Sequence, residues 1–404
     1  MKNNLLYILL VFILSQSISF ANYSSTQNAD IDNDFDVRIT QPISNDSLKE
    51  DKEENSTEPS FYEIISQGAR DIYNLEIEDT KSASFLLKDP LTHHFEKGPV
   101  DSVHLWGGGQ FDFATTIPSV RGDIDTQFKT PLINIILDAK FKGGKESFRI
   151  LLDAAPQHNR GFMHQFVQDL YVQTTRIPHH TLLIGSSRPG VGIEGAQSPF
   201  TLPFFMRSQI SRNFSNVRKC GVRLQGDYSM VDYDIGAYSS ATYFSEFFPG
   251  GEFDGWVNFK PLGKTDGRYG KLVLGVGTSL GKAHSTDYSV SQGYIGYEYK
   301  KFWTRAEYAY ADGSNGGSGL TSAKRDGLHA TVGYHLTKKL ELLARYDQFD
   351  PNKNVSHDNQ KEYTVGLNYY IKGQALRLIL NYVFCQNDNR ADSHRIIVGT
   401  QILL

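Results

Sequence analysis

The sequence predicts an all-β protein: a 16-stranded antiparallel transmembrane β-barrel with long external loops, preceded by a disordered acidic N-terminal segment. Three observations support this fold class: an export signal, a series of segments with period-2 alternation, and links that alternate in length. A mean hydropathy of −0.39 and an apolar run limited to residues 5–14 exclude a membrane protein built from helices, because a spanning helix needs about 20 apolar residues.

The N-terminus has the three parts of a secretory signal peptide. Lys2 supplies the positive charge, Leu5–Leu14 form the apolar region, and Ser19-Phe20-Ala21 offer small residues at a cleavage site. An uncleaved membrane anchor is the alternative, although the apolar stretch is short for a span. We therefore expect residues 1–21 to be a cleaved signal peptide and the mature protein to reach the outer membrane.

Residues 22–60 contain ten acidic and only three basic residues, separated by Ser, Asn and Thr. Such a composition cannot bury a core and repels itself, so we expect a disordered acidic linker. Residues 61–95 form a short pre-barrel segment, in which 61–76 have the spacing of an amphipathic helix. The barrel domain is then predicted over residues 96–404.

From about residue 102 the apolar residues follow period 2, which places alternate side chains on opposite faces of a strand. In 328–336, for example, Leu328, Ala330 and Val332 alternate with polar residues and glycine. Most segments run for about ten residues, the length of a transmembrane β-strand, whereas soluble strands average five or six. The sixteen predicted strands are 102–115, 132–143, 147–156, 164–176, 181–187, 217–228, 230–240, 254–262, 269–282, 288–299, 301–312, 326–336, 338–348, 359–372, 375–385 and 393–404.

With two exceptions, 263–268 and 283–287, the links between these segments alternate between short and long, as in outer-membrane barrels with short periplasmic turns and long external loops. Long links are predicted at 116–131, 188–216, 241–253, 313–325, 349–358 and 386–392. A soluble sandwich also alternates apolar and polar faces, but strand length and link asymmetry favour the barrel. Aromatic residues at segment ends fit interfacial girdles, as at Tyr299, Trp303, Tyr310, Tyr346 and Tyr382.

Sixteen strands enclose a water-filled channel rather than a packed core. By parity the inward face carries nearly equal numbers of acidic and basic residues, so the wall as a whole predicts no charge selectivity. We expect four of its basic residues to line the pore: Lys271, Arg305, Arg345 and Arg377.

Most of the longest link, 188–216, falls in the stretch between Glu194 and Asp227, which contains no acidic residue. If this link folds into the barrel, its basic groups would form a constriction that favours anions, since Arg and Lys line anion pores. Alternatively, Arg218 and Lys219 sit at a strand end and contact lipopolysaccharide or solvent. The candidate constriction residues are Arg207, Arg212, Arg218, Lys219 and Arg223.

Two sets of motifs resemble a known family. One comprises 202–208 (LPFFMRS), 218–227 (RKCGVRLQGD) and 233–238 (YDIGAY); the other comprises 343–352 (LARYDQFDPN) and 362–370 (EYTVGLNYY). Over residues 100–404 the chain is similar to the phosphate-selective porin O and P family. That resemblance implies a sixteen-stranded outer-membrane barrel, a homotrimer and the passage of small anions.

The chain also departs from this family. Met206 stands where the family usually carries Glu, and Leu404 ends the chain where Phe is usual. The solute therefore stays open between phosphate, other anions and general hydrophilic solutes.

We predict an outer-membrane porin in contact with outer-membrane lipid, without a cofactor, a metal site, catalytic residues or a nucleic-acid partner. No G-x-S-x-G or phosphate-loop motif occurs, and Cys220 and Cys385 lack metal-site spacing; whether they pair stays open. One alternative is an envelope anchor whose N-terminal segment binds a cell-wall component. A barrel enzyme is another alternative, although no nucleophile with an oriented base is visible in the sequence.

Overall fold

The computed structural model of the protein describes residues 91–403, except 121, 156–165, 196 and 266. The predicted signal peptide at 1–21 and acidic linker at 22–60 lie outside the described residues. Of the pre-barrel segment 61–95, only 91–95 is described. These domain assignments stay predictions.

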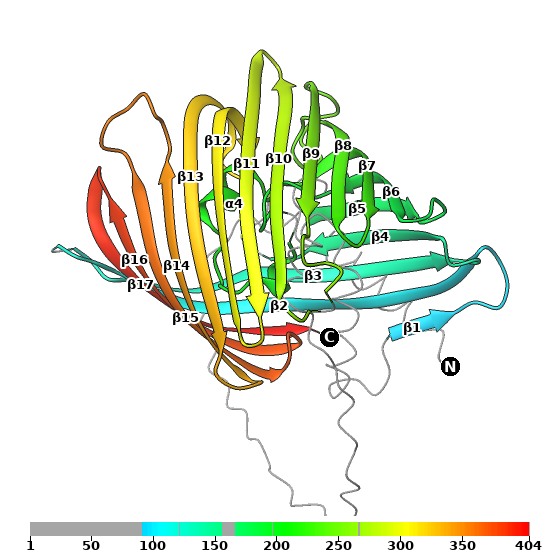
Figure 1. The fold of residues 1–404 in the computed structure, drawn as a ribbon, viewed down its shortest axis with the longest axis horizontal. Coiled ribbons are helices and arrows are strands. Elements are labelled where there is room, and N and C mark those ends of the chain that lie inside the picture. The colour runs from blue at the N-terminus through cyan, green and yellow to red at the C-terminus, as the bar shows by residue number, and fades with distance from the viewer. Residues whose placement is uncertain (1–90, 121, 156–165, 196, 266, 404) are drawn as a thin grey trace, which may run out of the picture. The chain divides into compact units, whose positions relative to one another are not determined.

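The described residues form seventeen strands (Figure 1). They are β1 (Leu91–His94), β2 (Val100–Pro118), β3 (Asp125–Phe141), β4 (Glu146–Asp153), β5 (Val167–Thr174), β6 (His180–Ser187), β7 (Lys219–Asp227), β8 (Val231–Ser239), β9 (Gly251–Phe259), β10 (Lys271–Ala283), β11 (Thr286–Tyr299), β12 (Phe302–Gly316), β13 (Gly319–His335), β14 (Leu340–Asp350), β15 (Gln360–Lys372), β16 (Leu376–Asn387) and β17 (Arg390–Leu403). A 3-10 turn, η4 (Pro199–Thr201), and a short helix, α4 (Gln209–Phe214), lie between β6 and β7.

Strands β2 to β17 form a closed antiparallel barrel. Each strand pairs with the next along the chain, and β17 pairs with β2 in a register that joins Val398 to Phe113. Closure leaves no free edge among these strands, which satisfies the backbone groups that a membrane cannot. The predicted 16-stranded barrel is therefore confirmed, and each of its strands overlaps one predicted segment.

The link predicted at 313–325 is wrong in extent, because β12 and β13 continue to pair as far as Gly316 and Gly319. Glycine and polar residues in this stretch suggested a loop. In the structure a register shift between Asp312 and Ser314, with Gly313 at φ +72°, keeps the hairpin paired. The glycines also allow close approach: a side chain at Gly316 would collide with the backbone of Phe214.

The short strand β1 was not predicted. It pairs with β2 through Leu91↔Leu105 and His94↔Ser102, just beyond the last pairing of β17, Leu403↔Gly108. β1 thus covers an edge of β2 that the C-terminal strand does not reach.

The outward face of the barrel is apolar. On β10 the outward residues Val276 and Leu280 are exposed, while the inward Val273 is buried. Tyr346, Tyr363 and Phe384 contact one another across neighbouring strands, with ring centroids 5.3 and 6.1 Å apart, as in an interfacial girdle. Among the described residues, no helix has the length and apolarity to cross a membrane.

Large aromatic side chains on the inward face lie over glycines of the neighbouring strand. A side chain at Gly277 would collide with the ring of Trp256, and one at Gly333 with the ring of Trp303. Trp303 was predicted to belong to an outer girdle, but it points inward, is 4% exposed and donates to Glu341 Oε1 at 2.7 Å. Parity along β12 explains this correction, since Trp303 shares the face of Arg305.

We expect Gly333→Ala to destabilise the barrel by about 1–3 kcal/mol, because a Cβ there meets Trp303 Cε2 at 2.1 Å and overpacking costs that much. The temperature at which the folded band disappears in heat-modifiability gels should fall. Gly293→Ala is the control, since a Cβ at Gly293 meets its nearest neighbour at 3.8 Å. Equal midpoints for the two variants would contradict the packing argument.

Candidate functional site

The chain between β6 and β7, residues 188–218 except 196, lies inside the barrel; we call it the inner segment. It includes η4 and α4, and α4 packs against β12, β13 and β14, behind the strands at the front of Figure 1. Its contacts are with side chains on the inward face of the strands, which alternate with the exposed apolar residues.

The main chain of the inner segment is held by polar side chains of the wall. Because a buried carbonyl without a partner costs about 1–3 kcal/mol, these donors stabilise an irregular backbone that has no sheet partner. The wall donors and their acceptors are Gln110 Nε2 to Pro199 O (3.0 Å), Gln401 Nε2 to Phe200 O (2.9 Å), Arg377 Nη1 to Leu202 O (2.9 Å), Asn368 Nδ2 to Pro203 O (2.9 Å) and Arg345 Nη1 to Met206 O (3.1 Å).

Two wall acceptors complete this set of contacts. Phe205 N donates to Asn381 Oδ1 at 3.0 Å, and Gln209 N donates to Asp347 Oδ2 at 2.8 Å. The second bond satisfies a free amide at the start of α4 beside the Ser208 cap, where a negative charge is also favourable.

Apolar side chains anchor the inner segment between its polar contacts. Phe200 packs with Leu132 and Leu403, and Phe204 packs with Trp303 and Leu343. A further cluster joins α4 to the wall and comprises Ile210, Phe214, Val290, Ala309, Ala311 and Phe349. The inner segment is thus packed like a protein core against β3, β11, β12, β14 and β17.

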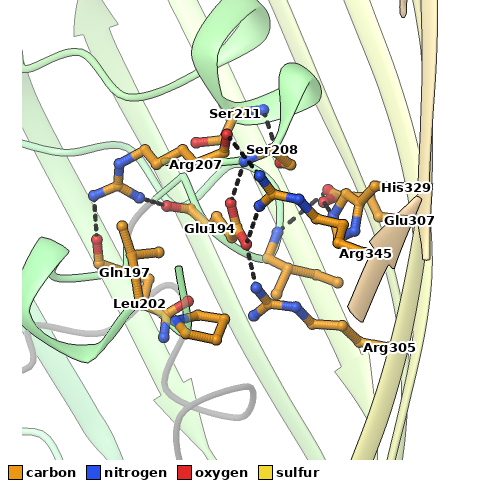
Figure 2. A network of polar contacts seen from close by, with 12 residues as sticks. Glu194, Gln197, Leu202, Arg207, Ser208, Ser211, Arg305, Glu307, His329 and Arg345 are labelled. Carbon is orange, nitrogen blue, oxygen red and sulfur yellow. Dashed lines mark hydrogen bonds and ion pairs between the residues drawn. The ribbon is translucent and has the colours of Figure 1, made fainter. Parts of the chain in front are cut away.

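Glu194 is the centre of a buried charged network, drawn in Figure 2. Its carboxylate pairs with Arg305, lies 3.7 Å from Arg345 Nη1 and accepts from Ser208 N at 2.5 Å. Nearby, Glu307 accepts from Ile193 N at 3.2 Å and lies 3.1 Å from His329 Nε2. The network joins the inner segment to β12, β13 and β14.

The environment of Glu194 keeps its carboxylate charged. Burial raises the pKa of Glu194, but the positive charges of Arg305, Arg345 and His329 outweigh burial and lower it to about 2. Removing one partner of such a buried pair costs about 3–5 kcal/mol, because the other charge stays buried.

The five residues predicted for the constriction are all placed in or beside the inner segment, and four of them pair with wall carboxylates. The pairs are Arg212 with Glu362 (2.5 Å), Arg218 with Asp169 (3.0 Å), Lys219 with Glu252, and Arg223 with Asp234 (2.5 Å). Arg207 instead donates to the main-chain oxygens of Glu194 and of Gln197, the latter at 2.7 Å.

The four residues predicted to line the pore have different surroundings. Arg305, Arg345 and Arg377 are at most 4% exposed, and each binds the inner segment. Lys271 is half-buried at the start of β10, opposite Glu298 in the register.

Sequence reasoning missed several residues that build this site. Arg188 donates from Nη1 to Gln197 O at 2.7 Å, and Arg207 donates to the same oxygen. Glu194 was noted only as the boundary of an acid-free stretch. Glu194 is the single acidic residue of a basic segment, and this could have been noticed in the sequence. A buried acid needs basic partners, so its position could have indicated the pairing.

Other site chemistry is limited in the described residues. They contain no group of three or more His, Cys, Asp or Glu arranged to hold a metal. Cys220 and Cys385 are both free, one exposed and one buried.

We expect Arg377→Gln to loosen the inner segment, because Leu202 O would lose its donor. Trypsin should then cleave the folded, purified barrel after Arg207 or Arg212 several-fold faster than it cleaves the unmodified protein. Arg176→Gln is the control, since Arg176 pairs with Glu146 and its side chain is 73% exposed. Unchanged cleavage in Arg377→Gln would show that this donor does not hold the segment.

Comparison with known proteins adds a family and a fold. Residues 267–403 match the family model described as phosphate-selective porin O and P. No curated protein matches the sequence.

Among solved structures, the chain is similar to the outer-membrane channel DcaP of Acinetobacter baumannii, with 12% identity and a TM-score of 0.55 over 77% of this chain and 100% of that one. It is also similar to Pseudomonas putida OprB, with 9% identity and a TM-score of 0.56 over 75% and 94%. A trimer form of Vibrio cholerae OmpT matches with 11% identity and a TM-score of 0.52 over 75% and 99%.

At these identities the solved structures establish a common fold alone. The family match covers β10–β17, and it includes the motifs at 343–352 and 362–370. The match of residues 267–403 supports the phosphate-selective porin O and P family, and the described residues have the barrel fold of the outer-membrane channels named above.

Proposed function

We propose that the protein is an outer-membrane porin for passive diffusion of small hydrophilic solutes, with a preference for anions. The closed barrel, its apolar outer face and the porin family match support a channel. The observation that carries the anion preference is a group of three arginines in the inner segment, which we call the arginine cluster: Arg188, which is half-buried, and Arg207 and Arg218, which are buried.

The arginine cluster concentrates positive charge. The guanidinium groups of Arg188 and Arg207 share one acceptor, Gln197 O, at 2.7 Å each. Arg218 is paired with Asp169 at 3.0 Å. Among the described residues, Asp169 is the one carboxylate that forms an ion pair with the arginine cluster. The Nε atom of Arg188 is buried and has no hydrogen-bond partner among the residues that the structure describes.

The pKa values of Arg188 and Arg207 shift in the direction expected of burial and crowded positive charge, whereas the pKa of Arg218 is raised because burial is outweighed there by Asp169. Burial and then the charges of Arg218 and Arg207 hold the pKa of Arg188 well below its usual range. Burial also lowers the pKa of Arg207 to about 10, against the opposing effect of Glu194. An anion close to these groups would reduce their repulsion, and guanidinium groups suit oxyanions through paired hydrogen bonds.

The other predicted constriction residues contribute less to this preference. Arg212, Lys219 and Arg223 each form an ion pair with a wall carboxylate, so each pair is close to neutral for a passing ion. We therefore assign selectivity to the arginine cluster rather than to the number of basic residues in the segment.

The test is the zero-current potential of the purified protein in a planar bilayer under a KCl gradient. We expect a chloride preference, and we expect Arg188→Gln with Arg207→Gln to reduce the chloride-to-potassium permeability ratio several-fold. Arg176→Gln, at a surface ion pair, should leave the ratio unchanged. Cation selectivity of the unmodified protein would refute the anion preference.

Phosphate added to the same bilayer separates two forms of the proposal. A decrease of the chloride current at millimolar phosphate, lost in the double variant, would assign oxyanion binding to the arginine cluster. Chloride preference without any effect of phosphate would make the protein a general anion porin.

We also propose a homotrimer, supported by the likeness of the fold to the trimer form of Vibrio cholerae OmpT, and a mature N-terminus after Ala21. Native mass spectrometry of the protein extracted from outer membranes tests both. A monomeric mass, or a mass that includes residues 1–21, would contradict the respective proposal.

A further inference from the structure

The carboxylate of Glu194 occupies a site with the features of a ligand-binding site. Two guanidinium groups, from Arg305 and Arg345, and one main-chain amide, from Ser208, surround the carboxylate. All four residues are at most 4% exposed. The donors come from β12, from β14 and from the residue that precedes α4 in the inner segment itself, as Figure 2 shows.

We propose that Arg305, Arg345 and the Ser208 amide form a carboxylate-binding site which the chain fills with its own Glu194, and that this occupation latches the inner segment to the barrel wall. A small free carboxylate would bind the same three donors when the Glu194 side chain is removed. The inference deepens the proposed porin function, because the position of the inner segment sets the width available to solutes.

The distribution of charge along the inner segment singles out Glu194. It is the only acidic residue of the segment in the sequence, and it meets two arginines of the wall. Most other wall contacts of residues 199–209 are hydrogen bonds to main-chain groups. Its charge remains in place at neutral pH, because its pKa is lowered to about 2.

The backbone around Glu194 supports a fixed position rather than an incidental contact. Gly192 has φ +74°, and a side chain there would lie 2.8 Å from both Gln292 Oε1 and Glu307 Oε1. Ile193 N donates to Glu307, and the Glu194 carbonyl accepts from Arg207. The latch therefore also positions Arg207, a member of the arginine cluster.

A native thiol reports whether the inner segment is docked. Cys385 is 6% exposed and lies opposite Glu362 in the register of β15 and β16, and Glu362 pairs with Arg212 of α4. Undocking of α4 would open Cys385 to water. The exposed Cys220 is removed by Cys220→Ser, which serves as the background for all variants.

The experiment measures the rate at which sulfonatoethyl methanethiosulfonate modifies Cys385 in the full-length protein in outer-membrane vesicles. We expect Glu194→Ala to increase this rate at least tenfold, and we expect added acetate to bring it back toward the background rate. Single-channel conductance should rise in the same variant and fall with acetate. Asp138→Asn is the control, because Asp138 forms a buried pair with Arg149 within the wall at 2.7 Å.

Glu194→Gln is a second variant in case the alanine variant does not fold. It keeps the side-chain volume and an acceptor for Ser208 N. We expect it to increase the modification rate without a response to acetate, since its amide still fills the site. Heat-modifiability gels confirm that each variant is folded.

Unchanged modification of Cys385 in both folded Glu194 variants would overturn the latch. A faster rate that acetate does not reverse in Glu194→Ala would overturn the carboxylate site. Absence of conductance in the unmodified protein would refute the porin function, while thiol modification would still decide the latch.

Discussion

The structure depends on one constraint: a chain segment without a sheet partner lies inside the barrel, and its buried polar groups need partners there. Side chains of the wall supply them. Gln401, Arg377 and Asn368 donate to successive carbonyls of the inner segment, so the polar residues of the inward face act as a substitute for a neighbouring strand. Without such donors, burial of several carbonyls would cost more than the apolar anchors Phe200 and Phe204 contribute.

Much of the fold could be predicted because period 2 and link length are local properties. Each barrel strand overlaps a predicted segment, and the motifs at 343–352 and 362–370 indicated the family that residues 267–403 match. One error occurred where glycine has two uses. Around Gly313 and Gly316 glycine suggested a loop, whereas the structure uses it for a bulge and for close contact with Phe214.

The candidate site could be predicted only in part, because pairing between distant residues leaves no local pattern. The acid-free stretch after Glu194 indicated a basic link, but the acids that pair with Arg212, Lys219 and Arg223 lie on other strands, between 11 and 150 residues away in the chain. A count of charges along a link therefore overestimates the field that a solute meets. Arg188 and Arg207 differ from these three residues, because both donate to a main-chain oxygen, that of Gln197.

The partners of the inner segment also impose an order on assembly. Phe200 is held by Gln401, 201 residues later in the chain, and Gln110 reaches Gln401 across 291 residues. A chain that grows from its N-terminus makes the inner segment before it makes β12–β17, the strands that supply most of its partners. Contacts between residues so far apart in the sequence form slowly. Docking of the inner segment must therefore follow the pairing of the last strands, and the interior is filled as the barrel closes.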